Sequence, residues 1–199
     1  MTSQKVYNDE SQFSADVVQF FRSKLTAAGL TTLHVEERQK ILKDFTVGKD
    51  REGRWRLIAG FQQQDIVFYA PSDVISMSDF MSRVMRVDKY DKTGEKPVII
   101  PLAICELKLG SKMNTHGMIT YASISTQLKN IFPHCVYYFV MDSNRERGIK
   151  PETVLRHSKG FDRVFLDWET EKEKVWATIQ SHFEYLRERR LLPTSGPSS

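Results

Sequence analysis

Apolar residues recur at two different spacings along the chain, and the change of spacing separates the expected helices from the expected strands. Spacing of three or four residues, or a proline in the first turn, predicts helices over Ser11–Ala28, Val74–Val87, Met118–Phe132, Pro151–His157 and Thr170–Arg190. Shorter apolar runs predict strands over Leu30–Glu36, Trp55–Ala59, Gln64–Tyr69, Val98–Leu109, Cys135–Met141 and Val164–Trp168. The pattern of Ile41–Val47 fits a helix or a strand.

Capping residues place the ends of three of these helices. Gly29 fits the stop of the first helix. Asn114 or Thr115 would cap the helix that starts near Met118, and Thr170 with Glu173 would form a capping box for the last helix. These signals support the helix assignments made from spacing alone.

The predicted elements alternate between helix and strand along most of the chain. This order is typical of an α/β fold with a central mixed sheet covered by helices on both faces. A length of 199 residues suits one domain, so we expect a single domain over residues 1–199. Residues 191–199, "LLPTSGPSS", read as a flexible tail.

Composition limits the classes of protein that fit. Hydrophobic residues at 40% and charged residues at 27% are ordinary values for a globular protein. No apolar run is long enough for a membrane span, and the N-terminus lacks the basic and then apolar order of a secretory signal, so we expect a cytoplasmic protein. Cys105 and Cys135 both lie in apolar runs, so we expect them to be buried free thiols. A net charge of +4 permits a polyanionic partner without requiring one.

Two charges stand inside the most apolar predicted strand, "VIIPLAICELKLG". Because side chains alternate along a strand, Glu106 and Lys108 share one face with Ile104. Isolated charges in a core cost several kcal/mol or more unless they are paired or bind a metal. One explanation is a local ion pair where the strand leaves the core. The other is a functional site.

A further carboxylate precedes the apolar run of "QQQDIVFYAP", where Asp65 opens the stretch Ile66–Tyr69. Two carboxylates on neighbouring strands repel each other unless a positive charge lies between them, and Mg²⁺ prefers such oxygen ligands. The backbone carbonyl of Leu107 would supply another ligand of this kind. Rival acids in helical or polar loop sequence are Asp73, Asp88 and Asp91.

The combination of "QQQDIV" with "ICELKL" on the next core strand resembles the PD-(D/E)XK, or restriction-endonuclease-like, nuclease superfamily over residues Ser11–Met141. The resemblance implies that core fold, with Asp65, Glu106 and the Leu107 carbonyl holding Mg²⁺, for which Mn²⁺ substitutes. It implies that Lys108 orients the attacking water or stabilises the charge that develops on the phosphate.

Two helix positions follow from the same resemblance. Several branches of the superfamily carry a glutamine on the helix after the Glu-x-Lys strand, and Gln127 stands there in this sequence. Resolvase-like members carry an acid on the first helix, where Asp16 stands and Glu10 competes. A polar helix edge explains Gln127 equally well, and a solvent-exposed acid explains Asp16.

Two loops offer groups that could touch nucleic acid. In "GSKMNTHG" these are Lys112, Asn114 and His116, and in "NRERGIK" they are Arg145 and Arg147. Plain solvated loops are the alternative for both segments.

The resemblance implies a metal-dependent endonuclease that leaves 5′-phosphate and 3′-hydroxyl ends, with double-stranded DNA as substrate and a homodimer as the assembly. A type II-like restriction endonuclease is the first expectation. A structure-selective repair or Holliday-junction-type nuclease, or an RNA-directed nuclease, is the alternative within the group. A non-catalytic nucleic-acid-binding protein on the same fold is the competing class.

Overall fold

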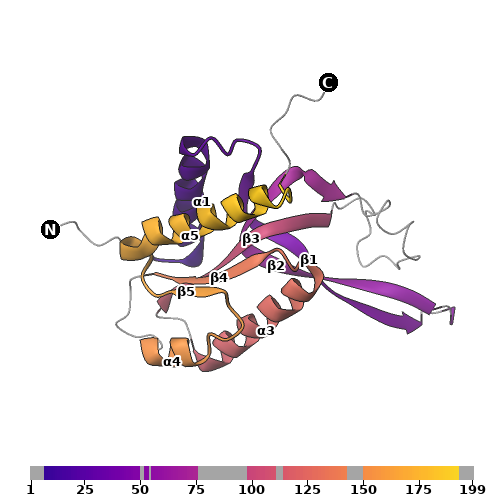
Figure 1. Cartoon of the computed structure of the whole chain (residues 1–199). Coiled ribbons are helices and arrows are strands. Elements are labelled where there is room, and N and C mark those ends of the chain that lie inside the picture. Colours follow the sequence, from indigo (N-terminus) through magenta and orange to yellow (C-terminus); the bar gives the residue numbers. More distant parts are fainter. Residues whose placement is uncertain are drawn as a thin grey trace, which may run out of the picture.

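A five-stranded mixed sheet with the order β1-β2-β3-β4-β5 forms the centre of the computed structural model (Figure 1). The structure describes residues 7–49, 52–53, 55–75, 98–110, 114–142 and 150–192. Its strands are β1 (His34–Lys49), β2 (Trp55–Ile75), β3 (Val98–Lys108), β4 (Val136–Met141) and β5 (Arg163–Phe165). The pairs β1–β2 and β2–β3 are antiparallel, whereas β3–β4 and β4–β5 are parallel.

Helices cover both faces of this sheet, as Figure 1 shows. They are α1 (Glu10–Ala27), α3 (Thr115–Ile131), α4 (Pro151–Arg156) and α5 (Trp168–Glu188). The larger core cluster joins α1 and α5 to one face through Phe21, Phe68 and Trp168, and the second joins α3 and α4 to the other through Met118, Tyr137 and Val154. The predicted mixed sheet between helical layers is confirmed.

Strand β3 lies at the centre of the sheet, between β2 and β4. Its eleven residues are buried except for Ile100 and Lys108, which are half-buried. A strand covered on both faces is expected to be apolar almost throughout, as this one is. The exceptions, Glu106 and Lys108, therefore lie in an otherwise apolar environment.

Two predicted helix starts have different outcomes. The Asn114 side chain accepts a hydrogen bond from the Gly117 N–H, so the predicted cap of α3 is confirmed. The capping box of Thr170 and Glu173 is wrong, because Asp167 caps α5 and Trp168 opens it. Trp168 is fully buried and packs against α1. The helix α5 therefore starts two residues before the predicted Thr170, and the preceding strand ends at Phe165.

Strands β1 and β2 are longer than the sequence pattern predicts. β1 starts at His34 rather than at the predicted Leu30. It continues as one strand through Ile41–Val47, because polar residues between Glu36 and Ile41 also pair with β2. The predicted helix Val74–Val87 is wrong at its start, where Val74 and Ile75 pair with β3. Its remaining residues, 76–87, lie outside the described residues.

Two composition-based expectations can be compared with the structure. Cys105 and Cys135 are buried free thiols, as predicted. Among the helices that the structure describes, none is long and apolar enough to span a membrane.

Candidate active site

Glu106 and Lys108 lie on the face of β3 that α3 covers. Ile104 belongs to the core cluster beneath α3, while Cys105, Leu107 and Leu109 belong to the cluster beneath α1 and α5. The predicted alternation along the strand is confirmed. Only 3% of Glu106 is exposed, so its carboxyl group is removed from bulk water.

Asp65 reaches this pair from β2 at the point where β2 and β3 stop pairing. Their ladder ends with Ile66 opposite Cys105. The Leu107 N–H donates to the Asp65 carboxylate instead, with a distance of 2.9 Å to Oδ2. The Asp65 side chain thus takes the place of a main-chain acceptor at the end of the ladder.

The regular alternation of side chains between the two faces of β2 is interrupted at Asp65. The adjacent residues Gln64 and Asp65 can therefore both reach the site. Gln64 contacts Tyr137 beneath α3, whereas Ile66 packs in the cluster beneath α1. Opposite this point, between the pairs formed by Glu37 and Gln39, Arg38 has a left-handed backbone with φ of 57°. Asp65 therefore lies opposite a residue with left-handed backbone geometry in the β1–β2 pair.

The Lys108 ammonium group connects the two carboxylates. Its Nζ lies 2.9 Å from Glu106 Oε1 and 3.5 Å from Asp65 Oδ2, and it sits 4.6 Å from the centre of the Tyr121 ring. Burial alone lowers the pKa of Lys108, but the attraction of Glu106 and Asp65 outweighs burial and raises that pKa above its usual value. Lys108 is therefore a permanently charged group.

The Glu106 carboxyl group has the opposite problem. Burial first, and the nearby charge of Asp65 second, raise the pKa of Glu106 to about 8, although Lys108 and Tyr137 partly offset the shift. At pH 7 this group is therefore protonated more often than not. A further positive charge between the carboxylates would favour the ionised form.

Two buried side chains that sequence reasoning missed hold Glu106 from the other side. The Tyr137 hydroxyl lies 2.8 Å from Gln64 Oε1 and 3.2 Å from Glu106 Oε2. Burial first, and the negative charges of Glu106 and Asp65 next, keep the pKa of Tyr137 well above its usual value, so its hydroxyl remains a donor. The one available signal was Gln64 itself, a polar residue at the edge of an apolar strand.

The remaining predicted residues lie elsewhere, and no observation tests their predicted roles. Gln127 is exposed on α3, and the side chain of α3 that reaches Lys108 is Tyr121. Asp16 accepts a hydrogen bond of 2.6 Å from the Tyr7 hydroxyl, which also lies 2.8 Å from Glu169. Asn114 caps α3.

Three predicted nucleic-acid contacts, Lys112, Arg145 and Arg147, lie outside the described residues. His116 is exposed in the first turn of α3.

The donor set fits a hard divalent cation. Asp65 and Glu106 both reach one ammonium group, so their oxygens converge on a position where positive charge is favourable. In an extended strand the N–H and C=O of one residue point to the same side, so the Leu107 carbonyl faces Asp65 as its N–H does. Two carboxylates and a carbonyl suit Mg²⁺, which keeps several waters. The described residues hold no group of three His, Cys, Asp or Glu side chains arranged for a metal.

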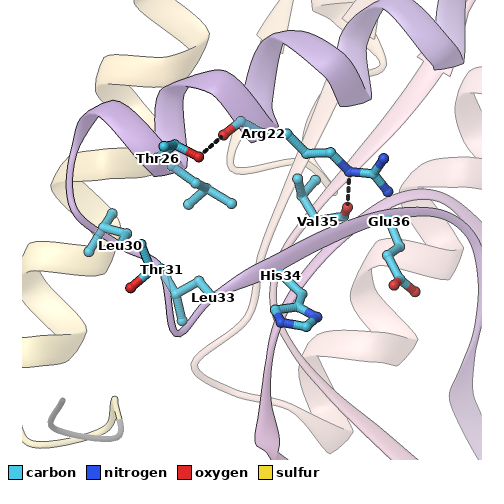
Figure 2. Close-up of a pocket in the computed structure, with 9 residues that line it drawn as sticks. Arg22, Thr26, Leu30, Thr31, Leu33, His34, Val35 and Glu36 are labelled. Carbon is cyan, nitrogen blue, oxygen red and sulfur yellow. Dashed lines mark hydrogen bonds between the residues drawn. The ribbon is translucent and has the colours of Figure 1, made fainter. Parts of the chain in front are cut away.

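A cavity of about 380 Å³ opens between the end of α1 and the start of β1, as Figure 2 shows. It contains none of the predicted site residues. Two of its polar groups are satisfied by the main chain, since Arg22 Nε donates to the Val35 carbonyl at 3.4 Å and Thr26 Oγ1 donates to the Arg22 carbonyl at 3.0 Å. The group formed by Asp65, Glu106 and Lys108 lies at the end of β3 and not in this cavity.

Comparisons with known proteins leave the function to be judged from this geometry. No protein-family model matches the chain, and no curated protein matches it. A solved structure described as the native BbvCI A2B2 tetramer matches with 14% sequence identity and a TM-score of 0.37. The match covers 66% of this chain and 44% of the other, so the chain spans less than half of that relative's length.

Proposed function

We propose that the protein is a metal-dependent DNA endonuclease whose site is formed by Asp65, Glu106 and Lys108. The observation that carries the proposal is the Lys108 ammonium group, which lies 2.9 Å from one carboxylate and 3.5 Å from the other at the divergence of two core strands. Together with the resemblance of "QQQDIV" and "ICELKL" to the PD-(D/E)XK superfamily, this convergence favours phosphodiester hydrolysis.

Asp65, Glu106 and the Leu107 carbonyl would hold Mg²⁺, or Mn²⁺ in its place. When bound, such an ion polarises a phosphate oxygen and lowers the pKa of a water molecule. Glu106 must lose its proton to serve as a ligand, and its raised pKa makes that loss depend on pH around 8. Tyr137 fixes the orientation of Glu106 through its hydrogen bond.

Lys108 supplies the fixed positive charge of the site. Its side chain is 13% exposed, so the ammonium group is largely shielded from bulk water. Held against the Tyr121 ring, it would donate to a non-bridging phosphate oxygen, where negative charge grows in the transition state. The products would be 5′-phosphate and 3′-hydroxyl ends.

Duplex DNA is the proposed substrate, and a type II-like restriction endonuclease acting as a homodimer is the proposed class. A repair or Holliday-junction-type nuclease or an RNA-directed nuclease would use the same site chemistry. In a non-catalytic binding protein, the same three residues would serve only as a buried ion pair. The alternatives within the group differ in substrate, so a panel of nucleic acids separates them.

A cleavage assay tests the proposal. Supercoiled plasmid, linear duplex, a four-way junction and single-stranded RNA are incubated with Mg²⁺, with Mn²⁺ or with EDTA. We expect cutting of DNA that needs the metal, that Glu106→Gln abolishes and that the control Glu184→Gln, an exposed carboxylate of α5, leaves unchanged.

Each result decides between the alternatives. Cutting confined to the junction or to RNA would replace the restriction-type substrate. Cutting that survives Glu106→Gln would show that the active site lies elsewhere. No cutting of any substrate would favour the binding protein.

A further inference from the structure

Strands β1 and β2 continue beyond the sheet as a two-stranded ribbon. We call residues 39–49 and 55–64 the arm. In this part of the structure β1 and β2 pair only with each other, because pairing with β3 begins at Ile66. The inner part of the arm is buried, with Leu42 and Ala59 packed near Ile131 at the end of α3, and Figure 1 shows the outer part projecting away from the helices that cover the sheet.

The outer part of the arm exposes a stripe of large apolar side chains. Val47 is 65% exposed, Trp55 is 63% exposed and Phe45 is 37% exposed. Period-two alternation and the pairing of Lys49 with Trp55 put these residues on one face of the ribbon. The Lys49 ammonium lies 5.0 Å from the centre of the Trp55 ring, so the stripe ends in a positive charge.

The arm also concentrates positive charge. Its two strands contain the basic residues Lys40, Lys43, Lys49 and Arg56 and the acidic residue Asp44, a net charge of +3. The whole chain has a net charge of +4, so most of the excess lies on this ribbon. Like charges disfavour contact between the arms of two copies, whereas a polyanion complements them.

The arm is joined directly to the candidate site. Its β2 strand ends at Gln64, next to Asp65, and Gln64 is held by Tyr137 in the hydrogen-bonded group around Glu106. From Trp55 to Asp65 the strand advances ten residues, or about 33 Å. That length is close to one turn of duplex DNA, about 34 Å.

We propose that the arm binds duplex DNA in the major groove, about one helical turn from the phosphate held at Asp65 and Glu106. This inference rests on the proposed function. The major groove admits a two-stranded ribbon, its thymine methyl groups suit an apolar stripe, and its flanking phosphates suit the arm lysines. The arm is thus the specificity element of the nuclease, and the strand end is its cutting element.

Fluorescence anisotropy with a labelled duplex tests the proposal, measured on the full chain in Mg²⁺ with Glu106→Gln as a common background that prevents cleavage. The arm variant carries Lys40→Ala, Lys43→Ala and Lys49→Ala. The control carries Lys24→Ala, Lys172→Ala and Lys174→Ala, three lysines of α1 and α5 that pair with glutamates. Both variants lose the same charge.

We expect the arm variant to bind more weakly and to lower the slope of log affinity against log salt by about 3, or about 1 for each lysine. The control should keep the slope of its background. Equal slopes for the arm variant and the control would overturn the proposal.

Tryptophan fluorescence gives a second readout that does not depend on charge. Trp168 and Trp176 are 0% and 7% exposed, so duplex DNA that contacts the arm should alter the emission of Trp55. The change should disappear in Trp55→Phe. An emission change that persists in Trp55→Phe would overturn the proposal.

The failure of the arm can be told apart from the failure of the nuclease. If the wild type cuts duplex DNA but the arm variant binds like the control, the arm proposal is wrong and the nuclease proposal stands. If the wild type neither binds nor cuts duplex DNA, both the arm proposal and the nuclease proposal are wrong. Sedimentation that shows dimers lost in Val47→Ser/Trp55→Ser, with duplex affinity unchanged, would make the arm a contact between copies and overturn the proposal.

Discussion

Two lysine–glutamate pairs in this molecule have similar geometry and very different surroundings. Lys24 and Glu173 pair at 2.6 Å between α1 and α5, with side chains that are 27% and 67% exposed. Lys108 and Glu106 pair at 2.9 Å on β3, with side chains that are 13% and 5% exposed. The first pair is an ordinary surface contact, which contributes about 0–1 kcal/mol.

The buried pair cannot be explained by stability. Removing two charges from water costs several kcal/mol for each ion, and apolar residues of similar volume often serve as well or better. A second carboxylate, Asp65, adds repulsion that raises the pKa of Glu106. This cost indicates that the charges have a functional role, and binding of the proposed metal and phosphate would be such a role.

Among the single substitutions, the largest expected effect on stability at one pH comes from breaking the buried pair. Lys108→Met should reduce the free energy of unfolding by about 3 kcal/mol at pH 7, because Glu106 and Asp65 then lack their shared cation. Urea unfolding measures the loss. A change below about 1 kcal/mol would mean that the two carboxylates do not depend on Lys108.

Removing the Tyr137 hydroxyl should have an intermediate effect. Tyr137→Phe removes the hydroxyl that lies 2.8 Å from Gln64 Oε1 and 3.2 Å from Glu106 Oε2, at a cost of about 1–3 kcal/mol. It should also raise the pKa of Glu106 further, because this hydrogen bond lowers it. Urea unfolding and the pH dependence of cleavage check both parts. Tyr185→Phe, at an exposed tyrosine, is the control, and an equal loss there would contradict the prediction.

The raised pKa of Glu106 predicts a specific dependence of stability on pH. The folded protein holds this proton until about pH 8, whereas the unfolded chain releases it near pH 4.5. The folded state therefore binds more protons between these values, so the stabilising contribution is present below pH 4.5 and is lost as pH rises to about 8.

The difference in unfolding free energy between the wild type and Glu106→Gln isolates this contribution. In the absence of metal it should decrease with pH by at most about 1.4 kcal/mol per unit. Mg²⁺ should reduce the decrease, since it favours the ionised carboxylate. A difference that rises with pH would contradict the assignment.

The smallest effect is expected at the exposed pair. Lys24→Met should change the free energy of unfolding by less than about 1 kcal/mol, and the change should shrink at high salt. Urea unfolding at two ionic strengths checks this. A loss as large as that of Lys108→Met would remove the contrast between the two pairs.

The sequence predicts the parts of this site that violate a simple pattern. Glu106 and Lys108 interrupt a buried strand, and Asp65 borders another, so each is conspicuous among apolar neighbours. The alternation of helices and strands likewise predicts the layered fold. These features are local in the chain, and they can be read without knowledge of which elements meet.

The missed residues depend on tertiary contacts. Tyr137 reads as one more aromatic residue of a core strand, and only the parallel pairing of β3 with β4 brings its hydroxyl to Glu106. Tyr121 rather than Gln127 faces Lys108, because that choice depends on the rotation of α3 against the sheet. The arm was missed because its inner residues, Ile41, Leu42 and Ala59, are buried while its outer residues, Phe45, Val47 and Trp55, are exposed, so its apolar pattern does not mark one buried face.

Titration with Mn²⁺ by calorimetry, in buffers of different ionisation enthalpy at pH 7.5, tests most directly whether the strand charges form a metal site. We predict that the wild type binds the ion and releases part of a proton from Glu106, and that Asp65→Asn and Glu106→Gln each lose this binding while Glu184→Gln retains it. Binding that is unchanged in both site variants, or a wild type that binds no ion, would contradict the account.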